Sequence, residues 1–283
     1  YYMNNTSIKL GTKIHMKVVL SKLQEFHHNV YVDDIDVQFL KDFEKAQTKK
    51  KKSLATVASY MRDIKKILNY FSQVKKIIPR DYIYPFGKGG YSIRLKKKKK
   101  NVLQEHEIES LIEFNNFETK KQEYAHNIFM LLYYACGINP IDLLKLRWED
   151  LDHNHFHFVR TKTETTRQSE VQELVIPLTE EVKFYLNKVG DPTSPFVLGK
   201  LHENYTDQSL RNRKNRFRQE INTELRKIGK RLNLSVTLRM SSARDAYAST
   251  LDRNGEAREN ISSMLGHSDI RTTANYLDSL SIN

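Results

Sequence analysis

Twelve residues near the C-terminus carry most of the information in this chain: Leu265-Gly266-His267-Ser268-Asp269-Ile270-Arg271-Thr272-Thr273-Ala274-Asn275-Tyr276. The segment combines a Gly-His pair, a Thr-Thr pair and a tyrosine nine residues after the histidine. Taken alone, a Gly-His pair is an ordinary end of a helix, because glycine readily adopts the left-handed conformation found there. Tyr276 alone could equally be a core residue. The interpretation therefore depends on residues elsewhere in the chain.

Two upstream segments add basic residues to this pattern. Ala243-Arg244-Asp245-Ala246-Tyr247-Ala248 contains an arginine on an expected helix, about 23 residues before the histidine. Arg160-Thr161-Lys162-Thr163 contains a lysine in the turn after an expected strand. Together with the C-terminal segment, they form a set of a tyrosine, a histidine, an arginine and a lysine.

This set resembles the tyrosine recombinase (phage integrase) family, and the likeness covers nearly the whole chain. The last box of the family reads Leu-Gly-His, then Thr-Thr, then Tyr nine residues after His, and residues 265–276 match it. Its Arg-x-Lys-Thr turn matches residues 160–163. The resemblance implies that Tyr276 attacks a DNA phosphodiester and forms a 3′-phosphotyrosyl intermediate. It also implies that Arg244 binds the phosphate, that His267 binds the phosphate or relays a proton, and that Lys162 protonates the leaving 5′-oxygen.

Two family boxes are altered in this chain. The His-x-x-Arg-His box falls on residues 241–245, where Ser241 and Asp245 replace the two histidines and Arg244 is kept. The Gly-Leu-Arg-x-x-Glu-Leu box falls on residues 137–143, where Asn139 stands in place of the first arginine. Because Pro140 follows it, Asn139 also fits the N-cap of a helix.

The missing arginine leaves two possibilities. Another cation fills its place, with Arg147, Arg239 and Lys120 as candidates, or the enzyme is slow or inactive. A similar loss occurs in integrases from mobile elements of the Bacteroides type, which this chain resembles in that respect. We keep Ser241 and Asn139 among the candidate site residues, together with Tyr276, Arg244, His267 and Lys162.

Basic residues are concentrated in the first third of the chain. The net charge is +13, and residues 1–100 contain 23 Lys and Arg against 8 Asp and Glu. Such charge favours a polyanion through phosphate contacts and counterion release. A helix predicted over residues 208–232 adds a second basic face. The candidate DNA-binding residues are Lys49, Lys50, Lys51, Lys52, Lys96, Lys97, Lys98, Lys99, Lys100, Arg211, Arg213, Lys214 and Arg216.

Composition excludes several classes of protein. With 39% apolar residues the chain is too hydrophobic to be disordered, and it contains no apolar run of about 18 residues that could span a membrane. Cys136 is the only cysteine, which excludes an internal disulfide and favours a reducing, cytoplasmic setting. No cofactor is expected. The start at Tyr1-Tyr2 suggests that an N-terminal arm-binding domain is missing.

The predicted fold is mainly α. Residues 1–86 form a small all-helical domain, residues 87–101 form a basic linker rich in helix breakers, and residues 102–283 form the catalytic domain. In the catalytic domain, alternation over residues 155–160 and 173–177 predicts one small antiparallel sheet among helices.

The resulting hypothesis is a site-specific recombinase or integrase of a mobile element. Its partners would be double-stranded DNA recombination sites, on which it assembles as a dimer or tetramer, with accessory DNA-bending proteins possible. The altered boxes leave a catalytically degenerate DNA-binding protein on the same fold as the main alternative. A type IB-like topoisomerase and an RNA-binding protein are weaker alternatives, because the box spacing opposes the first and only charge supports the second.

Overall fold

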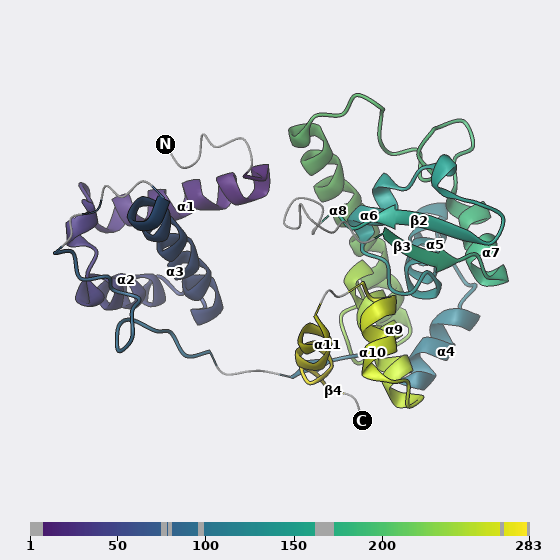
Figure 1. The fold of residues 1–283 in the computed structure, drawn as a ribbon. Helices are drawn as coiled ribbons and strands as arrows, with labels where there is room; N and C mark the ends of the chain where they lie inside the picture. The colour runs from purple at the N-terminus through teal and green to yellow at the C-terminus, as the bar shows by residue number, and fades with distance from the viewer. Residues whose placement is uncertain are drawn as a thin grey trace. The chain divides into compact units, whose positions relative to one another are not determined.

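The computed structural model describes residues 8–74, 78, 81–95, 99–161, 173–266 and 269–281. The chain divides into two compact units, Tyr1–Lys97 and Lys98–Asn283, and each is described here by itself (Figure 1). In these described segments, no helix combines the length and apolar character needed to cross a membrane.

The first unit is built from three helices, α1 (Leu10–Phe26), α2 (Val37–Lys49) and α3 (Leu54–Asn69), with short turns η2 (Val32–Asp34) and η3 (Tyr70–Val74). Side-chain caps start two of the helices, because the Asp36 carboxylate accepts from Phe39 N at 2.7 Å and the Ser53 hydroxyl from Thr56 N at 3.2 Å. The helices bury one core whose main members are Val19, Leu40, Phe43, Val57 and Ile64. His15 on α1 also contacts the buried Asp63 carboxylate on α3, which joins these two helices.

The second unit is organised around a buried helix. Its helices are α4 (Glu105–Glu113), α5 (Lys120–Tyr134), α6 (Pro140–Lys145), η4 (Trp148–Asp150), α7 (Glu180–Val189), α8 (Asp207–Arg231), α9 (Met240–Arg253), α10 (Arg258–Met264) and α11 (Ile270–Leu277). Helix α5 packs against α7, α8 and α9. Its segment Ile128-Phe129-Met130-Leu131-Leu132 is buried on every side, as expected of a helix surrounded by others.

The strands form two separate pairs. Strand β2 (His155–Val159) runs antiparallel to β3 (Glu173–Pro177), with Phe156 opposite Ile176. The predicted mainly helical fold with a small antiparallel sheet is therefore confirmed. A second pair was not predicted: β1 (Lys100–Asn101) lies parallel to β4 (Leu280–Ser281).

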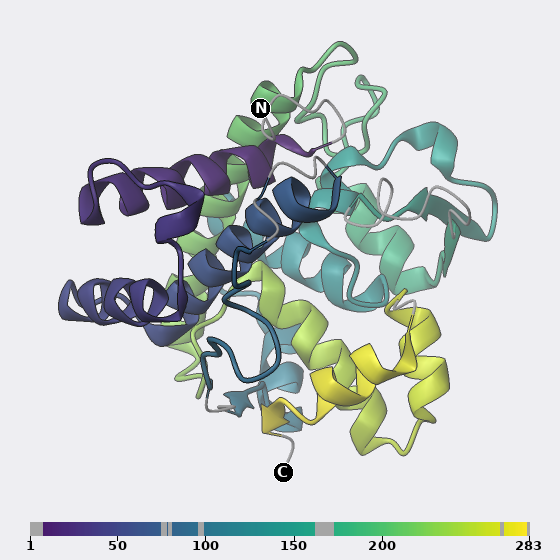
Figure 2. The same ribbon diagram turned by 60° about the vertical axis from the view of Figure 1, so that its left-hand side comes forward.

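Helix α11 and its surroundings form a small core at the C-terminal end of the chain. Asp269 caps this helix by accepting from Arg271 N at 2.9 Å. The core contains Ala248 from α9, Ile261 from α10, Leu277 from α11 and Leu280 from β4, together with Val102, which follows β1, and Leu265, which follows α10. Figure 2 shows these yellow-green and yellow helices packed side by side. Helix α11 and the residues of β1 are thus held in one cluster.

Candidate active site

Arg244 is fixed on α9 by two backbone carbonyl groups. Its Nη1 donates to Gly137 O at 2.9 Å and its Nη2 to Leu265 O at 2.5 Å. Gly137 has a φ of +64°, and a Cβ there would lie 3.0 Å from Arg244 Cα. A glycine is therefore required at this contact, both for the backbone conformation and for the close approach of Arg244.

Arg160 follows β2 and is anchored beside Arg244. Its Nη1 donates to Gly266 O at 2.5 Å, the carbonyl next to the one that Arg244 binds. Gly266 has a φ of +61°, and a Cβ there would lie 3.0 Å from Arg160 Cδ. The Leu-Gly segment at 265–266 thus orients two guanidinium groups. Sequence reasoning used Arg160 only as a marker for the adjacent lysine turn and missed its position in the site.

A buried carboxylate partly balances the two arginines. Burial, followed by the positive charge of Arg160, lowers the pKa of Arg244 to about 10, while Asp142 raises it. Burial also lowers the pKa of Arg160, and Asp142 again opposes the shift. Asp142 on α6 is only 4% exposed, and its Oδ1 accepts from Thr161 N at 2.9 Å. Asp142 therefore both neutralises charge and holds the backbone next to Arg160.

Asn139 acts as the N-cap of α6. Its Oδ1 accepts from Ile141 N at 3.2 Å, and Pro140 occupies the first helical position. The capping role predicted from its place before the proline is found in the structure. A neutral amide at this position supplies no cation to the site.

The three candidates for a replacement cation lie in different surroundings. Arg147 contacts Glu149 and Glu203 and lies over the ring of Phe196. Lys120 lines a cavity with Arg216 and Lys200. Arg239 lines a different cavity, which also contains Ser241 and Asp245. Among the described residues, Arg160 is the cation whose positive charge lowers the pKa of Arg244.

Tyr276 on α11 donates its phenolic hydrogen to Asp245 Oδ1 at 2.6 Å. Burial, together with the negative charge of Asp245, raises the pKa of this phenol, whereas Arg244 lowers it. The second carboxylate oxygen of Asp245 pairs with Lys100 Nζ. Asp245 occupies the place of a family histidine, and sequence reasoning did not recognise its contact with the tyrosine.

A polar cavity of about 470 Å³ opens beside Asp245. Its wall contains the basic residues Lys99, Lys100 and Arg239. Hydroxyl groups also line it, from Ser235, Thr237, Ser241 and Ser242. The combination of cations and hydroxyl donors suits an anionic backbone such as that of DNA. Ser241, a predicted site residue, therefore lies in a cavity wall next to the tyrosine's partner.

Several predicted residues lie outside the described part of the chain: Lys96, Lys97, Lys98, Lys162 and His267. Among the described residues, the structure brings together Arg244, Tyr276, Asp245 and Arg160. Across the described segments, no three His, Cys, Asp or Glu side chains are grouped as a metal site.

Four candidate DNA-binding lysines, at positions 49–52, lie at the C-terminal end of α2 and directly after it. Lys50 Nζ lies 3.6 Å from the carboxylate of Glu25. Lys49, Lys51 and Lys52 are exposed, and none of them forms an ion pair with another described residue. Their charges are therefore available to solvent or to a polyanion.

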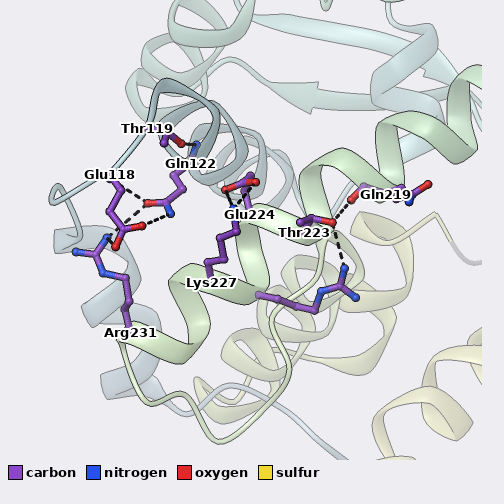
Figure 3. Close-up of polar contacts among 9 residues, drawn as sticks. Glu118, Thr119, Gln122, Gln219, Thr223, Glu224, Lys227 and Arg231 are labelled. Carbon is purple, nitrogen blue, oxygen red and sulfur yellow. Dashed lines mark hydrogen bonds and ion pairs between the residues drawn. The ribbon is translucent and has the colours of Figure 1, made fainter.

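Helix α8 has two chemically different halves. In the C-terminal half, basic residues bind within the unit: Arg231 lies 3.5 Å from Glu118, and Lys227 lies 2.9 Å from Glu224 (Figure 3). In the N-terminal half, Arg216 pairs with Glu220 at 2.9 Å. Arg211, Arg213 and Lys214 form no ion pair with any residue the structure describes.

Comparison with known families identifies the fold. The sequence profile of the phage integrase family matches residues 101–281, and that of the phage integrase SAM-like domain matches residues 1–88. The chain belongs to the phage integrase family. The resemblance drawn from the motifs is therefore confirmed at this level, while the finer likeness to Bacteroides-type integrases stays a prediction.

Individual relatives of this phage integrase are distant. Tyrosine recombinase XerD of Staphylococcus epidermidis (strain ATCC 35984) is 29% identical over 186 residues, covering 65% of this chain and 59% of the relative. The chain thus matches about three fifths of the length of that protein.

Solved structures share the fold of this phage integrase. The Tn1549 transposon integrase in complex with transposon right end DNA has a TM-score of 0.65 at 18% identity, covering 97% of this chain and 93% of that chain. A lambda integrase dimer bound to a COC′ core site has a TM-score of 0.63 at 13% identity, covering 99% and 92%.

Proposed function

We propose that this chain is a site-specific DNA recombinase that cleaves and rejoins DNA through a 3′-phosphotyrosyl bond at Tyr276. The observation that carries the proposal is a cluster of three side chains. Arg244 is close enough to Tyr276 for its positive charge to lower the pKa of the phenol, and Arg160 is close enough to Arg244 to lower the pKa of that guanidinium. A nucleophile beside two fixed cations is the arrangement that attack on a phosphodiester needs. Membership of the phage integrase family supports it.

In the proposed reaction, the two arginines stabilise the transition state. Negative charge concentrates there on the non-bridging phosphate oxygens, and a planar guanidinium can bind two oxygens at once. Arg244 and Arg160 are already oriented by the carbonyls of residues 265 and 266, so little reorganisation is needed when DNA binds. Arg160 takes the role of the first arginine that Asn139 does not supply.

The remaining steps follow the family resemblance. The Tyr276 oxygen forms a bond to phosphorus while the bond to the 5′-oxygen breaks, and Lys162 protonates that oxygen. His267 binds the phosphate. Rejoining is the reverse reaction, and the phosphotyrosyl ester conserves the energy of the broken bond, so the steps consume neither a nucleotide nor a metal.

The substrate in this proposal is a double-stranded recombination site of a mobile element, in the cytoplasm. Residues 1–86 clamp the DNA, the linker at 87–101 follows its backbone, and residues 102–283 perform the chemistry. The exposed lysines after α2, the lysines of the linker and the N-terminal half of α8 contact phosphates. Active complexes are dimers or tetramers on DNA, and accessory DNA-bending proteins assist them.

A covalent trapping experiment tests the proposal. The probe is a set of nicked DNA duplexes tiled across the sequence that flanks the gene, because cleavage near a nick releases a short fragment and leaves the adduct trapped. Wild type is compared with Tyr276→Phe. Tyr247→Phe is the matched control, since Tyr247 packs on the same small core but donates to Cys136 Sγ at 3.3 Å.

We expect a protein–DNA band on a denaturing gel with wild type and Tyr247→Phe, and none with Tyr276→Phe. All three should bind DNA with similar affinity. An adduct with Tyr276→Phe would reject Tyr276 as the nucleophile. If wild type binds the duplexes and forms no adduct, the degenerate DNA-binding protein suggested by Asn139, Ser241 and Asp245 is the better description.

A further inference from the structure

Asp245 lies between the tyrosine and a lysine at the start of the second unit. Its Oδ1 accepts from Tyr276 Oη at 2.6 Å, and its Oδ2 pairs with Lys100 Nζ. The residue is 6% exposed, whereas the Lys100 side chain is 55% exposed. A buried carboxylate is costly to keep ionised without a cation. Lys100 therefore supplies a positive charge that balances the Asp245 carboxylate, which the neutral phenol of Tyr276 does not supply.

The backbone fixes Lys100 relative to the tyrosine. Lys100 N donates to Ser279 O at 2.8 Å, and Ser279 N donates to Tyr276 O at 3.0 Å. Lys100 is also in register with Leu280 in the β1–β4 pair. The ion pair is consequently part of a structured contact between β1 and the segment after α11, and it does not depend on the side chains alone.

The phenol needs a proton acceptor. Burial and the adjacent carboxylate raise the pKa of Tyr276, so it does not ionise by itself near neutral pH. Asp245 is the carboxylate to which it already donates. Among the described residues, the charged groups facing Asp245 are Lys100 from β1 and Arg244 from its own helix, and Lys99 and Arg239 line the cavity beside it.

We propose, on the basis of the proposed function, that Asp245 accepts the phenolic proton of Tyr276 during strand cleavage and that Lys100, as its counter-ion, holds this carboxylate in place. The O–H bond of Tyr276 breaks and its proton moves to Asp245 Oδ1. The phenolic oxygen forms the bond to phosphorus, the bond from phosphorus to the 5′-oxygen breaks, and Lys162 protonates that oxygen. During rejoining, Asp245 returns the proton to Tyr276.

Single-turnover adduct formation at saturating DNA tests the role of Asp245. Asp245→Asn can still accept the hydrogen bond through its amide oxygen, but it cannot take the proton. We expect the rate to fall by about 10²–10⁴-fold, the usual range for loss of a general base. Binding to the same nicked duplex should not weaken. Asp245→Glu keeps a carboxylate and should recover part of the rate. Such a recovery would show that the loss in Asp245→Asn does not come from misfolding.

Single-turnover adduct formation also tests the role of Lys100. Lys100→Gln removes the cation paired with the buried Asp245 carboxylate, so the rate should fall in the wild-type background and change little further in Asp245→Asn, where no charge is left to pair. Lys188→Gln is the control, because Lys188 on α7 lies over the Phe184 ring and forms no ion pair with the described residues. It also removes one positive charge and should leave the rate unchanged in both backgrounds.

The outcomes separate this inference from the proposed function. A wild-type chain that forms no adduct overturns both. A wild-type adduct that forms equally fast in Asp245→Asn overturns the inference alone. Equal rates in Lys100→Gln and Lys188→Gln would reject the role of Lys100 as counter-ion.

Discussion

Arg160 and Arg244 donate to the carbonyl oxygens of two consecutive residues, Gly266 and Leu265, although they come from different elements of the second unit. Burial and, after it, the like charge of Arg160 lower the pKa of Arg244, so keeping both guanidinium groups charged here costs free energy. The carboxylate of Asp142 and the close contacts of Gly137 and Gly266 with the two arginines maintain the pair nonetheless. Two arginines held together in this way are suited to binding an anion between them.

Loss of Arg160 should slow cleavage. We expect Arg160→Ala to lower the rate of adduct formation by about 10²–10³-fold, the effect of removing one preorganised donor. Arg160→Lys should recover little of the rate, because lysine lacks the planar fork. The matched control is Arg147→Ala, since Arg147 is occupied by Glu149 and Glu203 and should leave the rate near wild type.

The chemical reason can be tested with an altered substrate. A methyl group in place of one non-bridging oxygen makes the scissile phosphate neutral, so a missing cation matters less. The rate ratio between wild type and Arg160→Ala should shrink on this methylphosphonate DNA. If the ratio is the same on both substrates, Arg160 is only structural.

Gly266→Ala should destabilise the second unit and displace Arg160. Its added Cβ would overlap Leu174 Cδ1 and lie 3.0 Å from Arg160 Cδ, at a φ of +61°. Gly255→Ala is the control, because Gly255 has a φ of +74° and no atom within 4 Å of the added Cβ. Urea unfolding should show a loss of about 1–2 kcal/mol for backbone strain alone at Gly255 and a larger loss at Gly266. Equal losses would contradict the predicted overlap with Leu174 and Arg160.

Glu107 should stabilise the fold in a pH-dependent way. Burial alone would raise its pKa, but hydrogen bonds from Ser235 and Gln104 outweigh burial and lower the pKa below the usual value. A lowered pKa gives stability that is present above the unfolded pKa and lost as the pH falls through the folded one. Glu107→Gln should therefore cost about 1–3 kcal/mol in the free energy of unfolding at pH 7 and much less in acid.

Glu109→Gln provides the comparison for this pH effect. Glu109 is on the same helix and is exposed, and its side chain has no hydrogen bond or ion pair with a described residue. Its substitution should change the free energy of unfolding little at either pH. A pH-independent cost at Glu107 would show that its hydrogen bonds do not depend on the ionised carboxylate.

The N-terminal half of α8 should contribute to DNA affinity. Replacing Arg211 and Arg213 by Gln should reduce the slope of log affinity against log salt by about 0.9 for each phosphate that the protein no longer neutralises. Lys227→Gln should leave the slope unchanged, because Lys227 is bound to Glu224 (Figure 3). Equal slopes for both variants and wild type would place the DNA-binding surface elsewhere.

Local features of the fold were predictable where one short segment carries the signal. Ser53 before α3 and Asn139-Pro140 before α6 indicate helix starts that the structure contains. Helix α11 was not predicted, because Ile270 and the Thr272-Thr273 pair are weak helix formers. It is stabilised by the packing of Leu277 against residues distant in the sequence.

The site was predictable only in part, for the same reason. The boxes identify Tyr276 and Arg244 through their spacing. The positions of Arg160 and Asp245 depend on contacts with Gly266, Tyr276 and Lys100 that no local pattern contains. The β1–β4 pair is two residues long on each strand, too short to produce an alternating pattern.

The cap formed by Asn139 limits what can be engineered at this position. An arginine there would remove the side-chain acceptor for Ile141 N, at a cost of about 1 kcal/mol. It would also bring a third guanidinium toward two that already oppose each other. Asn139→Arg would therefore lose both stability and charge balance, so supplying the family's arginine would not by itself make a better site.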